Sequence, residues 1–360
     1  MNAAESKRRW YHLTPDRAIV ALLAVECLLW LSYRLGCPTW HKGYAVLTGV
    51  ATLGVAFLVM LLWFLGSLLC RRRFQFSIRS LFTLVLIVAL SFGWLATETK
   101  KARQQKELVD QIGKRSVGYD WQHDAKGSAS PNAQPPEPIP VRKLVGDDFF
   151  SDVDRLTLGG DPFGNASDID PKQTTDSSLE HIKGFSQIKE LNLEATPVTD
   201  RGLEHLQGLK QLRRLILDDT QITDTGLAQL AGLGELQVLS LNSTRITDAG
   251  VAHLARLKRL QVLSLNYTGI TGAGLAHLAE LGDLQVLSLN GTGVTDAGLA
   301  HLAGLTKLHE LSLCNTKITD AGLAHLARMK QLGMVTLYGA IYTADGYREL
   351  QQALPNCKIR

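Results

Sequence analysis

The chain has 360 residues, of which 45% are hydrophobic and 7% aromatic, and its formal net charge is +4. This apolar fraction excludes a wholly disordered chain, and the length allows one to three domains. The five cysteines have neither the spacing of a disulfide framework nor that of a zinc site. Composition alone therefore indicates a folded chain with no disulfide framework and no zinc site.

The charge is divided unevenly along the chain. Residues 1–106 contain 14 Lys or Arg and 4 Asp or Glu, a net charge of +10, whereas residues 107–360 contain 24 and 30, a net charge of −6. The basic residues flank apolar runs, which is typical of a membrane topology signal and not of a nucleic-acid-binding patch. We therefore expect the first part to contact a lipid bilayer and the chain to bind no nucleic acid.

Three apolar runs predict transmembrane helices over residues 18–35, 44–69 and 78–96. A spanning helix needs about 20 apolar residues. The second run has no charged residue, whereas Glu26 and Arg34 weaken the first and the third is short. Together with a short juxtamembrane helix over residues 97–112, these runs predict a membrane anchor over residues 1–112.

Positive charge sets the orientation of such an anchor. One basic cluster precedes the first run and another fills the turn between the second and third (Lys7, Arg8, Arg9 and Arg17; Arg71, Arg72, Arg73 and Arg79). Three spans place both clusters in the cytoplasm and the rest of the chain outside. Four basic residues after the third run favour the opposite orientation (Lys100, Lys101, Arg103 and Lys106). The expectation is an integral membrane protein with an extracytoplasmic C-terminal domain.

Residues 113–155 predict a neck between the anchor and the repeats described below. Alternating polar and apolar residues over 116–121 predict a strand, and residues 127–140 contain five prolines and predict a loop. A solenoid needs a cap over its first hydrophobic face. We interpret the neck as that N-terminal cap.

A 24-residue repeat fills residues 156–360. Pairs of aliphatic residues, two positions apart, recur in one register from Leu191 onwards (Leu191 and Leu193, Leu215 and Leu217, Leu239 and Leu241, Leu263 and Leu265, Leu287 and Leu289, Leu311 and Leu313, Val335 and Leu337). Leu156 and Leu158 form an earlier pair, offset by 35 residues. A period of 20–29 residues with the L-x-x-L-x-L pattern is the signature of leucine-rich repeats. The predicted fold is an α/β leucine-rich repeat solenoid, with a parallel sheet on its concave side and helices on its convex side.

Each repeat predicts a strand, a turn and a helix. In one copy, residues 238–242 form the strand and Thr247 caps a helix through Leu257. An Asp follows the capping Thr in most copies, where the helix dipole favours an acid. A Gly two residues later predicts a close backbone approach or a non-helical backbone angle. The position that holds a buried Asn in many such repeats is Thr here and predicts a ladder bonding the turns (Thr196, Thr220, Thr244, Thr268, Thr292 and Thr316).

The motif ITDAGLAHLAGL and its copies resemble leucine-rich repeat proteins that have a full helix on the convex side. Similar motifs occur in F-box adaptor proteins and in membrane-anchored bacterial leucine-rich repeat proteins. The segments RRRFQFSIRSLF, GKRSVGYDWQ and GDDFFSDV resemble the basic turn and neck of the bacterial group. The resemblance implies a bacterial cell-membrane protein. No F-box-like helical module is found.

Two residue clusters contain the residue types that bind metals. Six histidines form one column along the repeats (His181, His205, His253, His277, His301 and His325). Successive helices lie too far apart for several of them to reach one ion, so we interpret them as exposed helix residues. Asp168 and Asp170 do not continue into a calcium-loop pattern. No catalytic motif was found, so we expect no enzymatic activity, no cofactor and no metal.

The favoured function is the binding of another protein, of unknown identity, by a membrane-anchored solenoid. The alternatives are a structural cell-envelope component or, if the repeats face the cytoplasm, an F-box-like adaptor for regulated degradation. The outward strand positions of the middle repeats are small and neutral, so binding is predicted at the two ends of the sheet. Aromatic and Arg residues dominate interface energy. The candidate binding residues are Arg214, Ile216, Asp218, Tyr267, Met334 and Tyr338.

Overall fold

The computed structural model describes residues 93, 96, 97, 99–107, 117–119, 153–159 and 171–360. The chain divides into two compact units, residues 1–107 with 119–152 and residues 108–118 with 153–360. The predicted spans lie outside the described residues, except for residues 93 and 96. Within the described residues, no helix has both the length and the apolar content needed to cross a bilayer. Residues 99–107 are helical, as the predicted juxtamembrane helix requires.

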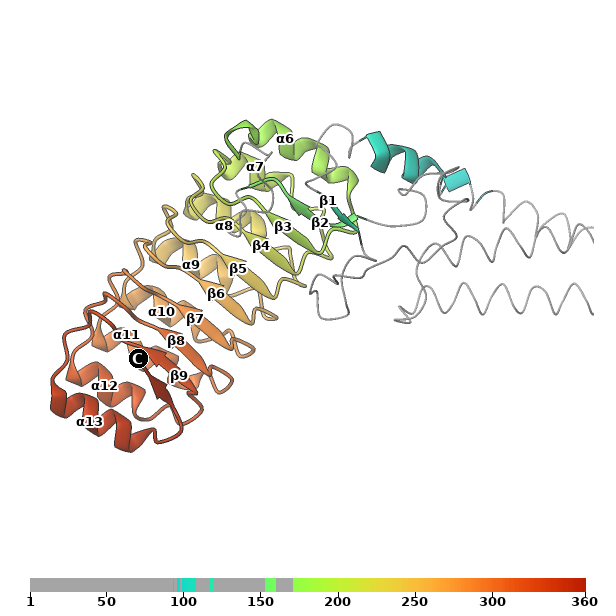
Figure 1. Cartoon of the computed structure of the whole chain (residues 1–360). Helices are drawn as coiled ribbons and strands as arrows, with labels where there is room; N and C mark the ends of the chain where they lie inside the picture. Colours follow the sequence, from blue (N-terminus) through green and yellow to red (C-terminus); the bar gives the residue numbers. More distant parts are fainter. Residues whose placement is uncertain (1–92, 94–95, 98, 108–116, 120–152, 160–170) are drawn as a thin grey trace, which may run out of the picture. The chain divides into compact units, whose positions relative to one another are not determined.

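Ten strands form one sheet in chain order, and the second unit contains nearly all of it (Figure 1). All pairings from the second strand to the last are parallel. The strands are β1 (Val117–Tyr119), β2 (Val153–Thr157), β3 (Glu190–Asn192), β4 (Arg214–Ile216), β5 (Val238–Ser240), β6 (Val262–Ser264), β7 (Val286–Ser288), β8 (Glu310–Ser312), β9 (Met334–Thr336) and β10 (Lys358–Ile359). Strand β1 confirms the strand predicted in the neck, most of which lies outside the described residues.

The register of the sheet follows the sequence period. Leu215 of β4 lies opposite Leu239 of β5, and each later strand repeats this shift of 24 residues. Between β2 and β3 the shift is 35 residues, with Leu156 opposite Leu191. Parallel strands place equivalent residues side by side, so the residues at one position of each repeat form a column across the sheet. The predicted solenoid is therefore confirmed in its sheet and its register.

Short helices line the other side of the solenoid (Figure 1). The α-helices are α6 (Asp176–Glu180), α7 (Asp200–Glu204), α8 (Asp224–Leu230), α9 (Asp248–Leu254), α10 (Gly272–Leu278), α11 (Asp296–Leu299), α12 (Asp320–Leu326) and α13 (Ala344–Ala353). The 3₁₀ turns are η4 (Pro171–Gln173), η5 (His181–Gly184) and η6 (Ala300–Gly304). Each α-helix begins directly after the predicted capping Thr.

The helix predicted to run through Leu257 ends earlier. Helix α9 ends at Leu254, and the N–H groups of Leu257 and Leu260 donate to the carbonyls three residues before them, at 2.8 and 3.0 Å. The exposed fraction of Leu254, Leu257 and Leu260 is at most 1%. Their spacing of three residues fits successive 3₁₀-type turns better than a helix of 3.6 residues per turn, and this explains the early end.

The core consists of the predicted aliphatic columns. In the repeat that begins at β5, the exposed fraction is 0% for Leu239, Leu241, Ile246 and Val251. The threonines of the predicted ladder donate from Oγ1 to the carbonyl oxygen of the residue three positions earlier, at 2.6–2.7 Å. This confirms the ladder and explains how a buried hydroxyl is satisfied in each turn.

The aspartates at the helix starts do more than complement the helix dipole. Each accepts two hydrogen bonds from the capping Thr of the next repeat, at 2.7–2.8 Å from the backbone N–H and 2.5–2.7 Å from Oγ1. These Asp–Thr pairs are Asp176 with Thr199, Asp200 with Thr223, Asp224 with Thr247, Asp248 with Thr271, Asp296 with Thr319, and Asp320 with Thr343. They connect neighbouring repeats along the helical side.

The recurring glycines accommodate these carboxylates. A Cβ atom added to Gly202 would lie 2.6 Å from Oδ1 of Asp176, and later repeats repeat this contact. Of the two predicted reasons for the glycines, close approach is therefore the one that applies, although the approaching group is a side chain. At Gly298 the contact is different, because position 272 is Gly and its Cα would lie 2.5 Å from the added Cβ.

Candidate protein-binding surface

The candidate surface is the sheet face, defined here as the side chains of β3–β9 that point away from the core, together with the residues two or three positions after each strand. On β5, β6 and β7 it has Val at the first position and Ser at the third. The residues that follow are Asn242, Asn266 and Asn290. These side chains are mostly half-buried. The middle of the sheet face thus presents one small and neutral pattern three times, as predicted.

The asparagines of this face form a ladder that the sequence analysis missed. Oδ1 of Asn242 accepts from the backbone N–H of Asn266 at 2.9 Å, and Oδ1 of Asn266 accepts from that of Asn290 at 2.8 Å. Asn290 continues the ladder to the N–H of Cys314 at 2.8 Å. The signal was an acid or amide in the same column of five consecutive repeats, from Glu194 to Asn290. Because these side chains already bond the backbone of the next repeat, the middle of the sheet offers few of them to a partner.

Three of the predicted residues lie together on and after β4. Arg214 is exposed and Ile216 is half-buried. Asp218, in contrast, begins the asparagine ladder, because Oδ1 accepts from the N–H of Asn242 at 2.8 Å and Oδ2 from Ser240 Oγ at 2.9 Å. Arg214 and Ile216 are therefore available for contact, while Asp218 has a structural role.

Two other predicted residues belong to the opposite end of the face. Met334 opens β9 and is half-buried, whereas Tyr338 follows β9 and is 78% exposed. Ile341, three residues after Tyr338, is 69% exposed and was not predicted. Tyr342 and Tyr347 stack nearby with ring centroids 6.0 Å apart. This end has two of the three large hydrophobic side chains that are exposed in the described residues.

Tyr267 is the third exposed large hydrophobic residue, at 63%. It follows β6 in a left-handed turn with φ of 56°. Its ring lies over Gly291 of the next repeat, because a Cβ atom added there would lie 2.5 Å from Tyr267 Cδ1. A residue with a side chain at position 291 would displace the ring. Tyr267 thus stands alone above the neutral middle of the face.

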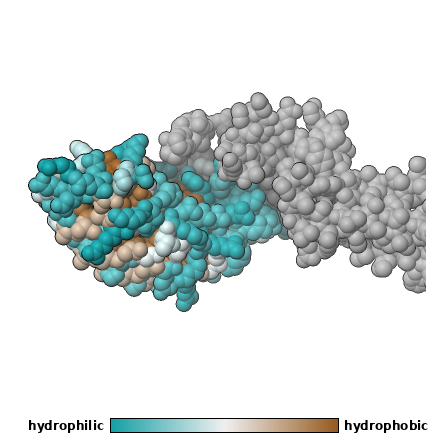
Figure 2. All heavy atoms as spheres, turned by 90° about the horizontal axis from the view of Figure 1, so that it is seen from below, coloured by the Kyte–Doolittle hydropathy of each residue, from teal (hydrophilic) through white to brown (hydrophobic). Residues whose placement is uncertain are grey.

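The structure does not bring the six predicted residues into one site. Five strand steps separate β4 from β9, which corresponds to about 24 Å at about 4.8 Å per step. One partner residue cannot contact both ends. The face that Figure 2 shows is largely hydrophilic, and apolar colour is confined to part of it.

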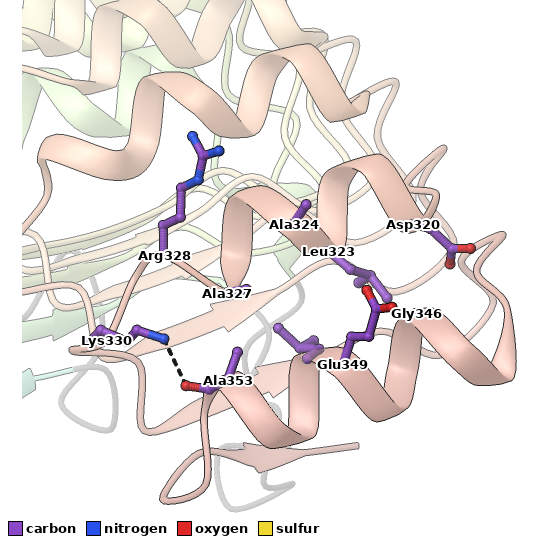
Figure 3. Close-up of a pocket in the computed structure, with 10 residues that line it drawn as sticks. Asp320, Leu323, Ala324, Ala327, Arg328, Lys330, Gly346, Glu349 and Ala353 are labelled. Carbon is purple, nitrogen blue, oxygen red and sulfur yellow. Dashed lines mark hydrogen bonds between the residues drawn. The ribbon is translucent and has the colours of Figure 1, made fainter.

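The helical side has a groove between α12 and α13, with a volume of about 420 Å³ (Figure 3). Leu323, Ala327 and Ala353 line it, and Lys330 Nζ donates to the carbonyl oxygen of Ala353 at 2.8 Å. Ala353 occupies the column that holds large buried residues in the earlier repeats (Leu209, Leu233, Leu257, Leu281, Leu305 and Met329). In this last repeat the buried leucine lies one position later, at Leu354, which is 3% exposed.

The histidine column lies on the helical side as predicted, and its members are exposed or half-buried. No group of three or more metal-ligating side chains occurs among the described residues. Nearby, Lys258 bonds Glu280 and lowers the pKa of that carboxyl, and burial raises the pKa of the Cys357 thiol. Neither Glu280 nor Cys357 belongs to the candidate surface.

No protein-family model and no curated protein matches this chain. Among solved structures, internalin C2 of Listeria monocytogenes is 27% identical over 53% of this chain and 81% of its own, with a TM-score of 0.40. A leucine-rich repeat protein of Leptospira interrogans is 19% identical over 50% of this chain and 56% of its own, with a TM-score of 0.35. The 24-residue period and the strand register define the class of fold, which is a leucine-rich repeat solenoid.

Proposed function

We propose that this chain is a membrane-anchored leucine-rich repeat protein that binds another protein through the two ends of its sheet face and has no catalytic role. The observation that supports binding is the contrast along this face. The middle repeats share one small pattern whose asparagines bond the next repeat, while Arg214 and Tyr338 stand exposed at the ends. Exposed Arg and Tyr are the residues that most often dominate protein interfaces.

The binding test has a matched control in the chain itself. Once affinity capture with the repeat domain has identified a partner, Arg214→Ala and Tyr338→Ala should each weaken binding by more than about 1 kcal/mol. Ser264→Ala should leave it unchanged, because Ser264 lies in the neutral middle of the face. Isothermal titration calorimetry measures all three. Equal losses at all three positions, or no loss at either end, would contradict the proposal.

The anchor part of the proposal is supported by the sequence: three apolar runs flanked by two basic clusters. We propose that these runs place the protein in the bacterial cell membrane with the repeats outside the cytoplasm. A reporter enzyme that is active only outside the cytoplasm, fused after Arg360, should be active. A silent outside reporter together with an active cytoplasmic one would reverse the orientation and require an even number of spans.

A further inference from the structure

The first strands of the sheet face have an unbalanced charge pattern. At β2 and the start of β3, two pairs of charges cancel: Arg155 contacts Glu190 at 2.8 Å, and Lys189, the residue before β3, contacts Asp154 at 3.5 Å. At the start of the next strand, the residues aligned with Lys189 and Glu190 are Arg213 and Arg214, and both are cationic. Beyond them, the aligned residues are the uncharged Gln237 and Val238. The arginines of β4 therefore face no acid on β5, and Glu190 on β3 already pairs with Arg155.

The two arginines are consecutive at the start of β4. Their backbone N–H groups both donate to the carbonyl oxygen of Lys189, at 2.7 and 2.9 Å, and the later repeats share this arrangement. Both are exposed, and Arg214 is the one exposed residue at the first position of β3–β9. The acid opposite Arg214 is Glu190, whose carboxylate accepts from Arg155. Asp218, at the other end of β4, is held by Asn242 and Ser240.

Ile216, two residues after Arg214 on β4, adds an apolar side chain. Residues i and i+2 of a strand lie on the same side, about 6.6 Å apart. Ile216 occupies the position that is Ser on β5, β6, β7 and β8, so the strand with the arginines is also the one with an aliphatic side chain there. Guanidinium groups bind carboxylates through paired, charge-assisted hydrogen bonds.

From this arrangement we infer that Arg213, Arg214 and Ile216 form a subsite for an extended segment of a partner protein that carries a carboxylate and, two residues away, an apolar side chain. The inference rests on the proposed binding function and gives it a partner chemistry. The arginines hold the acidic side chain, and Ile216 covers the apolar one. The repeat domain then takes its partner in one register at the N-terminal end of the face.

The experiment selects peptides from a random-sequence display library with the full chain in detergent micelles. Selected sequences should be enriched in Asp or Glu followed two positions later by an aliphatic residue. For one such synthetic peptide, fluorescence anisotropy should show at least about tenfold weaker binding to the variant carrying Arg213→Gln and Arg214→Gln. Ile216→Ser should give a smaller loss. Arg201→Gln on α7 and Arg256→Gln, both exposed arginines outside the sheet face, should bind as the parent does.

Circular dichroism of each variant checks that the fold is kept, which is the expected result because the arginines are exposed and Ile216 is only half-buried. Selected peptides without acids, or acidic peptides that bind the double variant unchanged, would overturn the subsite. If such peptides lose affinity with Tyr338→Ala instead, the proposed function stands and this inference fails. A library that yields no binder contradicts both. Competition by a single-stranded oligonucleotide as strong as by the peptide would show a general anion site and also overturn the inference.

Discussion

At the scale of single residues, the aspartates of the helix starts carry more of the structure than their surface position suggests. Asp224 accepts from the N–H of Thr247 at 2.7 Å and from its Oγ1 at 2.5 Å, and its Oδ1 occupies the space that Gly250 leaves. Three residue types, Asp, Thr and Gly, thus form one contact between consecutive repeats. Substitution of any one of the three disrupts this contact, because the contact depends on all of them.

We predict that Asp224→Ala lowers the free energy of unfolding by about 2 kcal/mol, because two hydrogen bonds to a carboxylate are lost and the N–H of Thr247 loses its acceptor. Asp283→Ala is the matched control. Asp283 contacts Lys307 at 2.7 Å, but the two side chains are 43% and 59% exposed, so the loss should stay below about 1 kcal/mol. Urea unfolding followed by circular dichroism measures both. Similar losses for the two variants would contradict the role of the Asp–Thr pairs.

The candidate residues show what the sequence could and could not reveal at this scale. That the side chains of Arg214 and Tyr338 point away from the core follows from their position beside the buried Leu215 and Leu337 in a repeat of known register. The role of Asp218 does not, because a polar residue that points away from the core looks the same whether it faces water or the next backbone. The donors to its carboxylate, the N–H of Asn242 and Oγ of Ser240, become visible only when neighbouring strands are placed side by side.

At the scale of elements, one repeat departs from the others. Position 272 is Gly where the other helix starts from α6 to α12 have Asp, so Thr295 has no carboxylate from the preceding repeat. The Thr295 side chain makes no cap hydrogen bond either, and α11 is only 4 residues long before the chain continues as η6. Gly272 and Gly298 approach through their backbones instead. The missing Asp–Thr pair and the short helix occur in the same place.

We predict that Gly272→Asp raises the free energy of unfolding by about 1 kcal/mol, since it adds a carboxylate to the first turn of α10 and two acceptors for Thr295. Amide hydrogen exchange at Thr295 should slow as well. Gly282→Asp is the control, because it introduces the same residue at an exposed glycine with no atom near its added Cβ. It should change stability by less than about 0.5 kcal/mol. A loss of stability in Gly272→Asp would show that the two repeats cannot separate enough to admit the carboxylate.

At the scale of the whole molecule, the repeat made the fold predictable because a single period fixes the register of every strand. Once Leu215 pairs with Leu239, the constant period fixes the partner of each later aliphatic pair in the sheet. The lengths of the helices were less predictable, because buried leucines three residues apart can lie on one face of a short α-helix as well as on successive 3₁₀ turns. The membrane anchor and most of the neck stay predictions, since they lie outside the described residues.

A final prediction concerns the independence of the repeat domain. We expect the fragment 113–360 to be soluble and to fold alone, because its apolar residues occupy periodic core columns and the long apolar runs end at residue 96. A fragment that begins at residue 171 is the matched control. It lacks β2, in which Val153 and Leu156 are 1% and 0% exposed, so the core beside β3 would meet water. Thermal unfolding followed by circular dichroism should give one cooperative transition for 113–360 and a lower midpoint, or aggregation, for the shorter fragment. An unfolded 113–360 fragment would place the domain boundary elsewhere, and equal midpoints would mean that β2 does not cap the solenoid.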